Sequence, residues 1–307
     1  MNLKQLQYFV RVFEMRNMTR AAESLHVAQP ALSQQIALLE DDLGVRLLTR
    51  GPKGVQATHE GLLLYRHAQT ILRQVDITRS LLAKSDAQIT GTVSIGLASS
   101  TARMIALPLM QRAKREIPGV VLEIVDIPSA DLTKLVLQGR VDFSLSPDQQ
   151  AIMGLDVTPL MIEDLYLLAH PDVTLPSENV SIRQIIDIPL ILPSLPNQLR
   201  ARVDHAFMSA RLTYHLFAEA STSAILIPAA REGLAATILP YSAAQPEIVN
   251  RLITKHSLDF KLSREISLCS SANAPENPAV EKVIALTKAT IKQLIDDQHW
   301  PGCRILY

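Results

Sequence analysis

Through its first 43 positions the chain repeats apolar residues at the spacing of amphipathic helices. A first helix is predicted from one apolar stripe, with Asn2 as its N-terminal cap; the stripe consists of Leu3, Leu6, Phe9, Val10 and Phe13. Two shorter helices follow between positions 17 and 44, joined by a tight turn at residues 26–28. Pro30 is expected at the start of the later helix, where its fixed φ is already helical and its missing N–H is not needed. The pattern therefore predicts a helix-turn-helix braced by the first helix.

The later of the two short helices has two distinct faces. Its inward face is predicted at the i, i+4, i+7 and i+11 positions, which are Leu32, Ile36, Leu39 and Leu43. Gln29, Ser33 and Gln34 then lie on the opposite side, near the helix N-terminus. A helix that buries one stripe and presents amides and a hydroxyl at its start suits a DNA major groove. The alternative is a packing unit whose polar face is merely solvated.

Two short strands with a glycine-rich tip are predicted next. Residues 45–48 and 55–58 have strand-like composition, and Gly51-Pro52-Lys53-Gly54 between them is a turn signal. Such a hairpin beside a helix-turn-helix makes a wing. Arg50 and Lys53 lie on or beside the tip, where cations can contact phosphates or a minor groove. Ordinary surface charge is the alternative interpretation of both side chains.

A long helix is predicted from Thr58 onward, because the next proline lies well past residue 90. Its apolar positions recur at spacings of 4, 3, 4, 3 and 4, the a/d pattern of a coiled coil over nearly three heptads; they are Leu64, Ala68, Ile71, Val75, Thr78 and Leu82. A dimerisation helix is one interpretation, and a helix packed on its own domain would show the same pattern. Residues 85–91 are expected to form a hinge.

From residue 92 the pattern changes to alternating strands and helices, which is typical of α/β folds with a mainly parallel sheet. A first set comprises strands at 93–97, 120–125 and 141–145 and helices at 104–115 and 132–138. A second set comprises strands at 165–169, 189–192, 214–217 and 234–239 and helices at 199–211 and 222–232, followed by a strand at 266–269 and a helix at 279–295. Two lobes are expected, one from 92–162 and 266–307 and one from 163–265. With chain crossings near 161–164 and 261–265, they suggest a periplasmic-binding-protein-like clam shell.

Hydroxyl-bearing residues gather where the predicted strands pass into helices. Parallel sheets bind ligands at the carboxyl ends of their strands, and free N–H groups at helix N-termini favour anions. If the lobes face each other, these segments line one cleft, and the candidate effector contacts are Ser99, Ser100, Thr101, Pro128, Ser129, Ser194, Asn197, Ser221 and Thr222. Helix capping explains each hydroxyl equally well. We expect a small anionic effector in this cleft.

Length and charge change this picture only modestly. A chain of 307 residues exceeds one ordinary core, so we expect a head at 1–58, a linker helix and hinge at 59–91 and a body at 92–307. The net charge is zero, but residues 1–90 carry 11 Lys and Arg against 8 Asp and Glu, and the remainder carries 19 against 22. The asymmetry is compatible with a DNA-binding head on a more acidic body.

Neither membrane insertion nor a familiar catalytic motif is indicated. No apolar run approaches the ~20 residues of a membrane span, and the N-terminus lacks the apolar region of a signal peptide. Cys269 and Cys303 lie outside any C-x-x-C pair, which fits a reducing cytoplasm. No G-x-S-x-G elbow, P-loop, H-E-x-x-H or G-x-G-x-x-G occurs, so we expect no catalytic residue, cofactor or metal site. A solute-binding protein with a helical oligomerisation module, exported or cytoplasmic, would explain the body but not the head.

The head resembles the winged helix-turn-helix of LysR-type transcriptional regulators position by position; the matching residues are Ala21-Ala22, Ala28-Gln29-Pro30-Ala31-Leu32-Ser33, Leu39-Glu40, Leu43-Gly44, Leu47-Leu48 and Arg50. The resemblance covers the whole chain and implies an all-α winged head, a dimerising helix and a two-lobed α/β effector domain. It further implies a homodimer, assembling to a tetramer, on an interrupted inverted repeat in double-stranded promoter DNA, with RNA polymerase as another partner. The implied DNA contacts are Thr19, Gln29, Pro30, Ser33, Gln34, Arg50, Lys53 and Thr58, and the implied dimer contacts are Leu64, Ala68, Ile71, Val75 and Leu82.

A narrower match is similar to the nitrogen-assimilation-control subgroup of that family; it consists of Arg200-x-Arg202-Val203-Asp204-x-Ala206-Phe207, Arg211-Leu212-Thr213 and Ile238-Leu239-Pro240. One position departs from the family, since many members carry arginine where this chain has Gln34. A glutamine cannot make the bidentate guanine contact of an arginine, but it pairs with adenine N6 and N7. The resemblance therefore implies control of nitrogen or related metabolic genes, with an A·T preference where Gln34 reads DNA.

Overall fold

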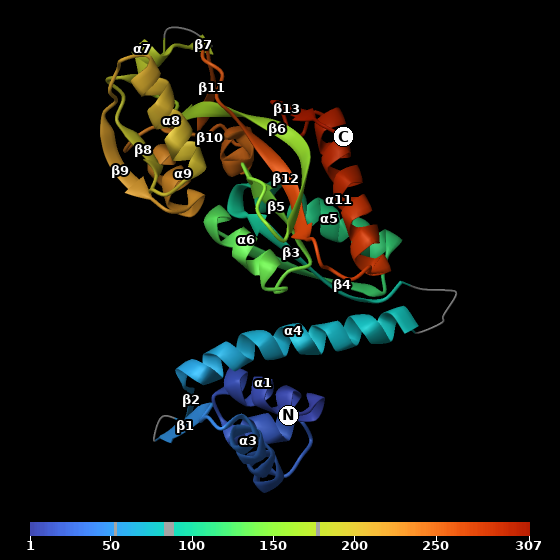
Figure 1. Ribbon diagram of the computed structural model, residues 1–307. Helices are drawn as coiled ribbons and strands as arrows, with labels where there is room; N and C mark the ends of the chain where they lie inside the picture. Colours follow the sequence, from blue (N-terminus) through green and yellow to red (C-terminus); the bar gives the residue numbers. More distant parts are fainter. Residues whose placement is uncertain (52–53, 83–88, 176–178) are drawn as a thin grey trace. The chain divides into compact units, whose positions relative to one another are not determined.

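The computed structural model describes residues 1–51, 54–82, 89–175 and 179–307 and divides the chain into two compact units, Met1–Asp86 and Ala87–Tyr307 (Figure 1). The first unit contains the predicted head and the long helix. The second unit contains the predicted α/β body. Lys53 at the wing tip and part of the predicted hinge lie outside the described residues.

The first unit begins with a core of three helices, α1 (Leu3–Met15), α2 (Met18–Ser24) and α3 (Gln29–Leu43). All three contribute to one buried apolar cluster that includes Phe9, Ala22 and Leu32. Asn2 caps α1 as predicted, since its side chain accepts the Gln5 N–H at 2.9 Å. The predicted helix-turn-helix and its bracing first helix are confirmed.

Strands β1 (Leu48–Gly51) and β2 (Gly54–Ala57) form the predicted antiparallel hairpin, but β1 begins three residues later than expected. The later start is explained by Glu40. Its carbonyl accepts a hydrogen bond from the N–H of Val45, and its carboxylate accepts hydrogen bonds from the N–H groups of Leu47 and Leu48. Leu43 was expected to face inward but is 37 % exposed. Along α3 the head core reaches only as far as Leu39.

Helix α4 (His59–Leu82) has 24 residues, which corresponds to about 36 Å at 1.5 Å per residue. The first part of its predicted seam is buried, since Leu64 packs against the head cluster and Ala68 is fully buried. Further along, Ile71 is 36 % exposed and Val75 is half-buried, while the side chain of Leu82 lies outside the described residues. The alternative interpretation, packing on the helix's own domain, therefore applies to the first turns. The dimerisation role of the later positions stays a prediction.

The first lobe of the second unit is a mixed sheet in the order β4-β3-β5-β12-β6. Its strands β3 (Gly91–Ala98), β4 (Val120–Ile127) and β5 (Phe143–Pro147) are parallel, as the alternating pattern predicts. Helix α6 (Ser129–Leu137) covers the face that carries Gly96, where an added Cβ would lie 2.9 Å from Leu132 Cδ2. Helices α5 (Ser99–Glu116) and α11 (Pro278–Asp296) pack together against the opposite face (Figure 1).

The second lobe pairs strands β8 (Leu190–Pro193) and β9 (Leu216–Ala220) in parallel. Strands β10 (Thr237–Pro240) and β11 (Thr254–Leu258) pair with the long strand β6 (Leu155–Ala169), and β7 (Asn179–Val180) pairs with β11. The helical segments are α7 (Ile182–Ile185), α8 (Gln198–Ser209), α9 (Ser223–Arg231), η1 (Tyr241–Ala243) and α10 (Gln245–Val249). The sequence pattern does not predict the short elements β7, α7, η1, α10 and β11.

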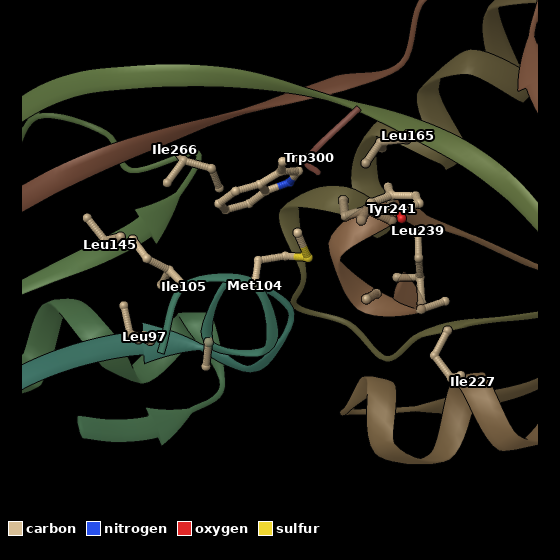
Figure 2. Close-up of a cluster of buried hydrophobic side chains, with 14 of the residues drawn as sticks. Leu97, Met104, Ile105, Leu145, Leu165, Ile227, Leu239, Tyr241, Ile266 and Trp300 are labelled. Atoms are coloured by element: carbon tan, nitrogen blue, oxygen red, sulfur yellow. The ribbon is translucent and has the colours of Figure 1, made fainter. Parts of the chain in front are cut away.

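Strands β6 and β12 (Ser263–Ser271) carry the chain between the lobes and pair with each other from Leu155↔Ser271 to Asp164↔Ser263. The crossings expected near 161–164 and 261–265 fall within β6 and at the start of β12. The strand predicted at 165–169 is only the last third of the 15-residue β6, since Pro159 interrupts the sequence signal at a register shift. Strand β13 (Cys303–Ile305) also pairs with β6. One apolar cluster spans both lobes around Trp300, which is 1 % exposed (Figure 2).

Candidate DNA interface and ligand cavity

The N-terminal turns of α3 carry the side chains predicted to read bases. Pro30 and Gln34 are exposed, while Gln29 and Ser33 are half-buried. The N-cap residue Ala28 supplies no side-chain cap, and no acidic residue lies in the first turn. The positive end of the helix dipole is therefore left for an outside anion, such as a phosphate of a nucleic acid.

The other predicted DNA contacts lie on α2 and around the hairpin. Thr19 is exposed on α2. The backbone of Arg50 pairs with Val55 in the hairpin, but its side chain, like all of Lys53, lies outside the described residues. The hydroxyl of Thr58 donates to the carbonyls of Arg46 and Leu47 and accepts the Gly61 N–H at 2.9 Å. Thr58 thus begins α4 and holds the start of the wing, and its DNA contact stays a prediction.

Glu40 is a structural position beside the wing that the sequence pattern does not predict. Its Oε1 accepts the N–H groups of Leu47 at 2.8 Å and of Leu48 at 3.0 Å, and its Oε2 pairs with Arg46. The residue is only 8 % exposed, so this carboxylate ties the end of α3 to the first strand of the wing. The available signal was its position four residues after the inward-facing Ile36, where an apolar residue would be expected.

A cavity of about 430 Å³ lies where the strand ends of the two lobes meet. Its wall is built from the junctions β3–α5, β4–α6, β8–α8 and β9–α9, in agreement with ligand binding at carboxyl ends of strands. Eight of the nine predicted effector positions line it, namely Ser99, Ser100, Pro128, Ser129, Ser194, Asn197, Ser221 and Thr222. Thr101 is the exception, because it is fully buried in α5 and lies behind the wall. Thr101 therefore does not line the cavity in this structure.

Three charged residues of the wall were missed: Asp126, Asp148 and Arg264. Asp126 lies near the end of strand β4, shortly before α6, and Asp148 directly follows β5, so the strand-end rule could have found both. Arg264 lies in β12, on the crossing between the lobes, where no local sequence pattern marks it.

Arg264 is the centre of a buried polar network at the base of the cavity. Its Nε and Nη2 contact Oε2 of Glu163 at 2.8 and 2.6 Å, and Nη2 also donates to Ser100 Oγ at 2.9 Å. The other carboxylate oxygen of Glu163 accepts the Trp300 Nε1–H at 2.8 Å. Glu163 is fully buried and Arg264 is 6 % exposed, so each charge depends on the other for neutralisation. These hydrogen bonds connect the cavity wall to the single tryptophan of the chain.

Two ion pairs join the lobes beside the cavity. Arg202 of α8 contacts Oδ1 of Asp148 at 2.6 Å, and that oxygen also accepts the Glu265 N–H at 3.0 Å. Arg103 of α5 donates to the carbonyl of Ala243 at 3.1 Å and lies 3.4 Å from Glu247. Both pairs connect an element of one lobe to an element of the other, so they stabilise the arrangement in which the cavity is formed.

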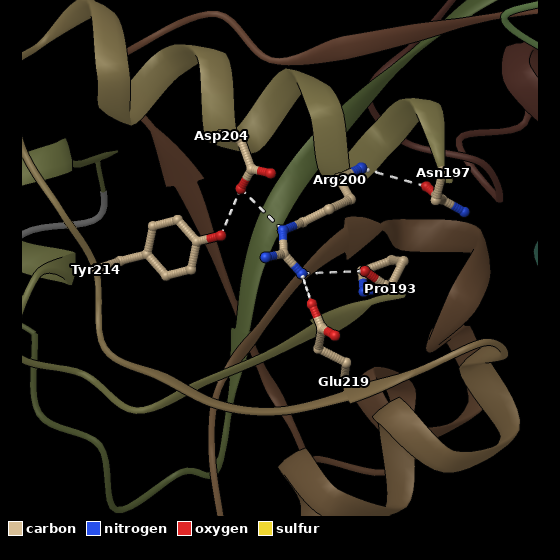
Figure 3. Close-up of polar contacts among 6 residues, drawn as sticks. All are labelled: Pro193, Asn197, Arg200, Asp204, Tyr214 and Glu219. Carbon is tan, nitrogen blue, oxygen red and sulfur yellow. Dashed lines mark hydrogen bonds and ion pairs between the residues drawn. The ribbon is translucent and has the colours of Figure 1, made fainter. Parts of the chain in front are cut away.

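A second network fixes the wall that the second lobe contributes. Arg200 donates to Asp204 at 2.8 Å, to the carbonyl of Pro193 at 3.3 Å and to Glu219, and Tyr214 donates to Asp204 (Figure 3). Burial opposes the charged form of Arg200, but the hydrogen bonds to Asp204 and Glu219 prevail, and its pKa is raised above the ordinary value. Burial and then the Asp204 bond raise the pKa of Tyr214 to about 12. One guanidinium thus holds the ends of β8 and β9, where the chain enters the cavity wall.

The two cysteines should react slowly in the folded protein. Burial raises the pKa of the Cys269 thiol to about 11, and burial followed by the charge of Glu163 also raises the pKa of Cys303. A raised pKa means that the thiolate, which is the reactive form, is scarce at about pH 8. We expect Ellman's reagent to detect no fast-reacting thiol in the native protein and both thiols in guanidinium chloride. A fast native thiol would contradict the raised pKa of these two thiols.

The protein combines two parts. One is a winged helix-turn-helix head in which the start of α3, the recognition helix, is exposed, and the other is a two-lobed unit with a cavity between its strand ends. This combination defines the class of two-part DNA-binding regulators. In the described parts of the chain no group of three or more His, Cys, Asp or Glu side chains is placed to hold a metal ion. The helices described there also include none that is long and apolar enough to cross a membrane.

Comparisons with known proteins identify the family. Residues 86–292 match the LysR substrate binding domain, and residues 3–62 match the bacterial regulatory helix-turn-helix protein, lysR family. The nitrogen assimilation regulatory protein nac of Klebsiella aerogenes is 36 % identical over 286 residues, covering 92 % of this chain and 93 % of its own. Its counterpart from Escherichia coli (strain K12) is 35 % identical over 289 residues, covering 92 % and 94 %. The chain belongs to the LysR family of DNA-binding transcriptional regulators, and these identities support its place in the nitrogen-assimilation subgroup.

Solved structures agree with the fold. The LysR family regulator CbnR aligns with a TM-score of 0.72 at 21 % identity, over 94 % of this chain and 99 % of CbnR. A full-length OxyR variant from Pseudomonas aeruginosa aligns with a TM-score of 0.71 at 23 % identity, over 95 % of each chain. CbnR has also been solved in complex with its target DNA. The predicted fold class, an all-α winged head followed by a two-lobed α/β domain, is therefore confirmed.

Proposed function

We propose that this regulator acts as a homodimer, assembling to a tetramer, on an interrupted inverted repeat in promoter DNA. The observation that carries the proposal is the uncapped, exposed start of α3, with Gln34 and Pro30 facing outward. Gln29, Pro30, Ser33 and Gln34 meet base edges in the major groove. Thr19, Arg50, Lys53 and Thr58 contact phosphates or the minor groove.

Dimerisation follows from the limited reach of one recognition helix, which contacts too few base pairs to find a site in a genome. The exposed Ile71 and half-buried Val75 of α4 support a contact between two copies. Leu82 is proposed as a further residue of that contact. Leu64 contributes indirectly, because it packs against the head cluster and so fixes α4 on the head, and Ala68 is fully buried beside it on the same helix. Bound upstream of a promoter, the assembly acts on RNA polymerase in the cytoplasm and needs no catalytic residue or cofactor.

The cavity of the second unit binds a small effector that carries an acid group. Support comes from Arg264 in the wall and from the N-terminus of α5, which has neither a side-chain cap nor an acidic residue in its first turn. Effector binding changes the packing of the lobes, and with it the spacing of the heads and the bend of the DNA. The related nitrogen assimilation regulatory proteins favour nitrogen-related genes as the targets. Genome-wide mapping of bound sites tests that assignment.

The Gln34→Ala variant should bind its operator about 1–3 kcal/mol more weakly and lose preference at one base pair, because the amide that reads adenine is gone.

Lys53→Ala should instead weaken binding to all DNA sequences alike and reduce the salt dependence of binding, because it removes a phosphate contact. Fluorescence anisotropy with the operator and with single-base-pair substitutions of it measures both effects at several salt concentrations.

Gln7→Ala is the matched control, since Gln7 is an exposed glutamine on α1 rather than on α3. It should leave affinity and base preference unchanged. Equal, sequence-independent losses for Gln34→Ala and Lys53→Ala would show that Gln34 does not read a base.

A further inference from the structure

The buried guanidinium of Arg264 has one nitrogen left for a ligand. Nε and Nη2 are engaged by Glu163, Ser100 and Ser242, whereas Nη1 has no hydrogen-bond partner among the residues that the structure describes. The side chain is 7 % exposed and forms part of the cavity wall. This nitrogen remains accessible at the cavity wall, and a carboxylate is the acceptor that suits a guanidinium N–H best. One end of the cavity is therefore built for an acid group.

Asp126 places a negative charge in the wall of the same cavity. Its carboxylate is exposed in the wall, and within the described part of the chain its one hydrogen-bond partner is the Ser99 hydroxyl, at 2.6 Å. Asp148, the other acidic residue of the wall, differs because it is paired with Arg202. Among the described residues no cation thus neutralises Asp126, and a ligand ammonium group would supply one.

The formal charges of the cavity wall distinguish between a purely anionic ligand and a zwitterionic one. Arg264 is balanced by Glu163 and Arg202 by Asp148, which leaves the charge of Asp126 uncompensated. A purely anionic ligand would be drawn to Arg264 but repelled by Asp126 in the same cavity of about 430 Å³. We propose that the effector is a small zwitterion of the amino-acid class, with its carboxylate on Arg264 and Ser100 and its ammonium group on Asp126. This inference rests on the proposed effector function of the cavity.

Isothermal titration calorimetry on the full-length protein tests it, with each common L-amino acid at millimolar concentration as the probe. Emission of Trp300, the single tryptophan, gives a second readout because Glu163 links its ring to Arg264. For each amino acid that binds, the two comparison compounds are the carboxylic acid without the amino group and the amino acid amide without the carboxylate. We expect at least one amino acid to bind, and both comparison compounds to bind about tenfold more weakly or less, as expected for a lost charge-assisted hydrogen bond.

Asp126→Asn provides the decisive variant, with Asp131→Asn as its matched control. Asp131 is an exposed aspartate in the first turn of α6 that does not line the cavity. Asp126→Asn should weaken amino acid binding about tenfold or more and leave binding of the amine-free acid unchanged or stronger, while Asp131→Asn changes neither. Equal affinity of the amine-free acids and the amino acids, or unchanged affinity in Asp126→Asn, overturns the zwitterion assignment and leaves the effector cavity standing. Binding of neither compound class overturns the effector function as well.

Discussion

Replacing Glu163 by alanine should lower the free energy of unfolding by about 3–5 kcal/mol. The change leaves the guanidinium of Arg264 buried without its counter-charge and removes the acceptor of the Trp300 Nε1–H. An uncompensated buried charge is far more costly than the loss of the pair's own attraction. Urea unfolding followed by the emission of Trp300 measures the effect, because this tryptophan lies in the second unit.

A double-mutant cycle separates the interaction between Glu163 and Arg264 from the effect of removing each side chain alone. Arg264→Ala should destabilise the protein by a similar amount, whereas Glu163→Ala combined with Arg264→Ala should cost less than the sum by about 1–3 kcal/mol. Glu276→Ala, which truncates an exposed glutamate of the same unit, should stay within about 0.5 kcal/mol of the parent protein. Strict additivity of the two single variants would show that Glu163 and Arg264 do not depend on each other.

Glu40→Ala should destabilise the head by about 2–4 kcal/mol and weaken binding to every DNA sequence. The substitution removes the acceptor of two buried backbone N–H groups, Leu47 and Leu48, each of which costs about 1–3 kcal/mol when left unpaired. The wing then loses its attachment to α3, so phosphate contacts suffer while base preference at Gln34 persists. Hydrogen exchange of the peptides covering residues 45–51, together with DNA-binding anisotropy, reports both consequences.

Two substitutions control this prediction. Glu40→Gln keeps an amide oxygen for the two N–H groups and gives up only the pair with Arg46, whose side chain is 82 % exposed, so its cost should stay below about 1 kcal/mol. Asp41→Ala removes a neighbouring exposed carboxylate and should leave exchange unchanged. If residues 45–51 exchanged at the same rate in Glu40→Ala and Asp41→Ala, the wing would not depend on Glu40.

Local patterns were sufficient for most of the architecture. The apolar stripe of α1, the cap at Asn2 and the proline at the start of α3 act over one or two turns, so the sequence predicts the head closely. The same applies to the strand-end rule, which placed eight of nine effector candidates on the cavity wall. Thr101 was expected on the cavity wall but is buried, because a single residue step along α5 turns a side chain from the cavity toward the core. Leu43 failed because helical periodicity does not show where a neighbouring core ends.

The helix-turn-helix, the α/β alternation and the polar strand ends each rest on neighbours within a few positions, so the amino-acid order alone accounts for them. The charge of the cavity depends instead on how the chain folds in three dimensions. Arg264 and Glu163 are separated by 101 positions, and Arg202 and Asp148 by 54, so no local period relates them. Which carboxylates are neutralised depends on chain crossings that bring β6, β12 and α8 together. Of the acidic residues in the cavity wall that the structure describes, Asp148 forms an ion pair and Asp126 does not. For this reason the ligand proposed here is a zwitterion, whereas the sequence alone predicts an anion.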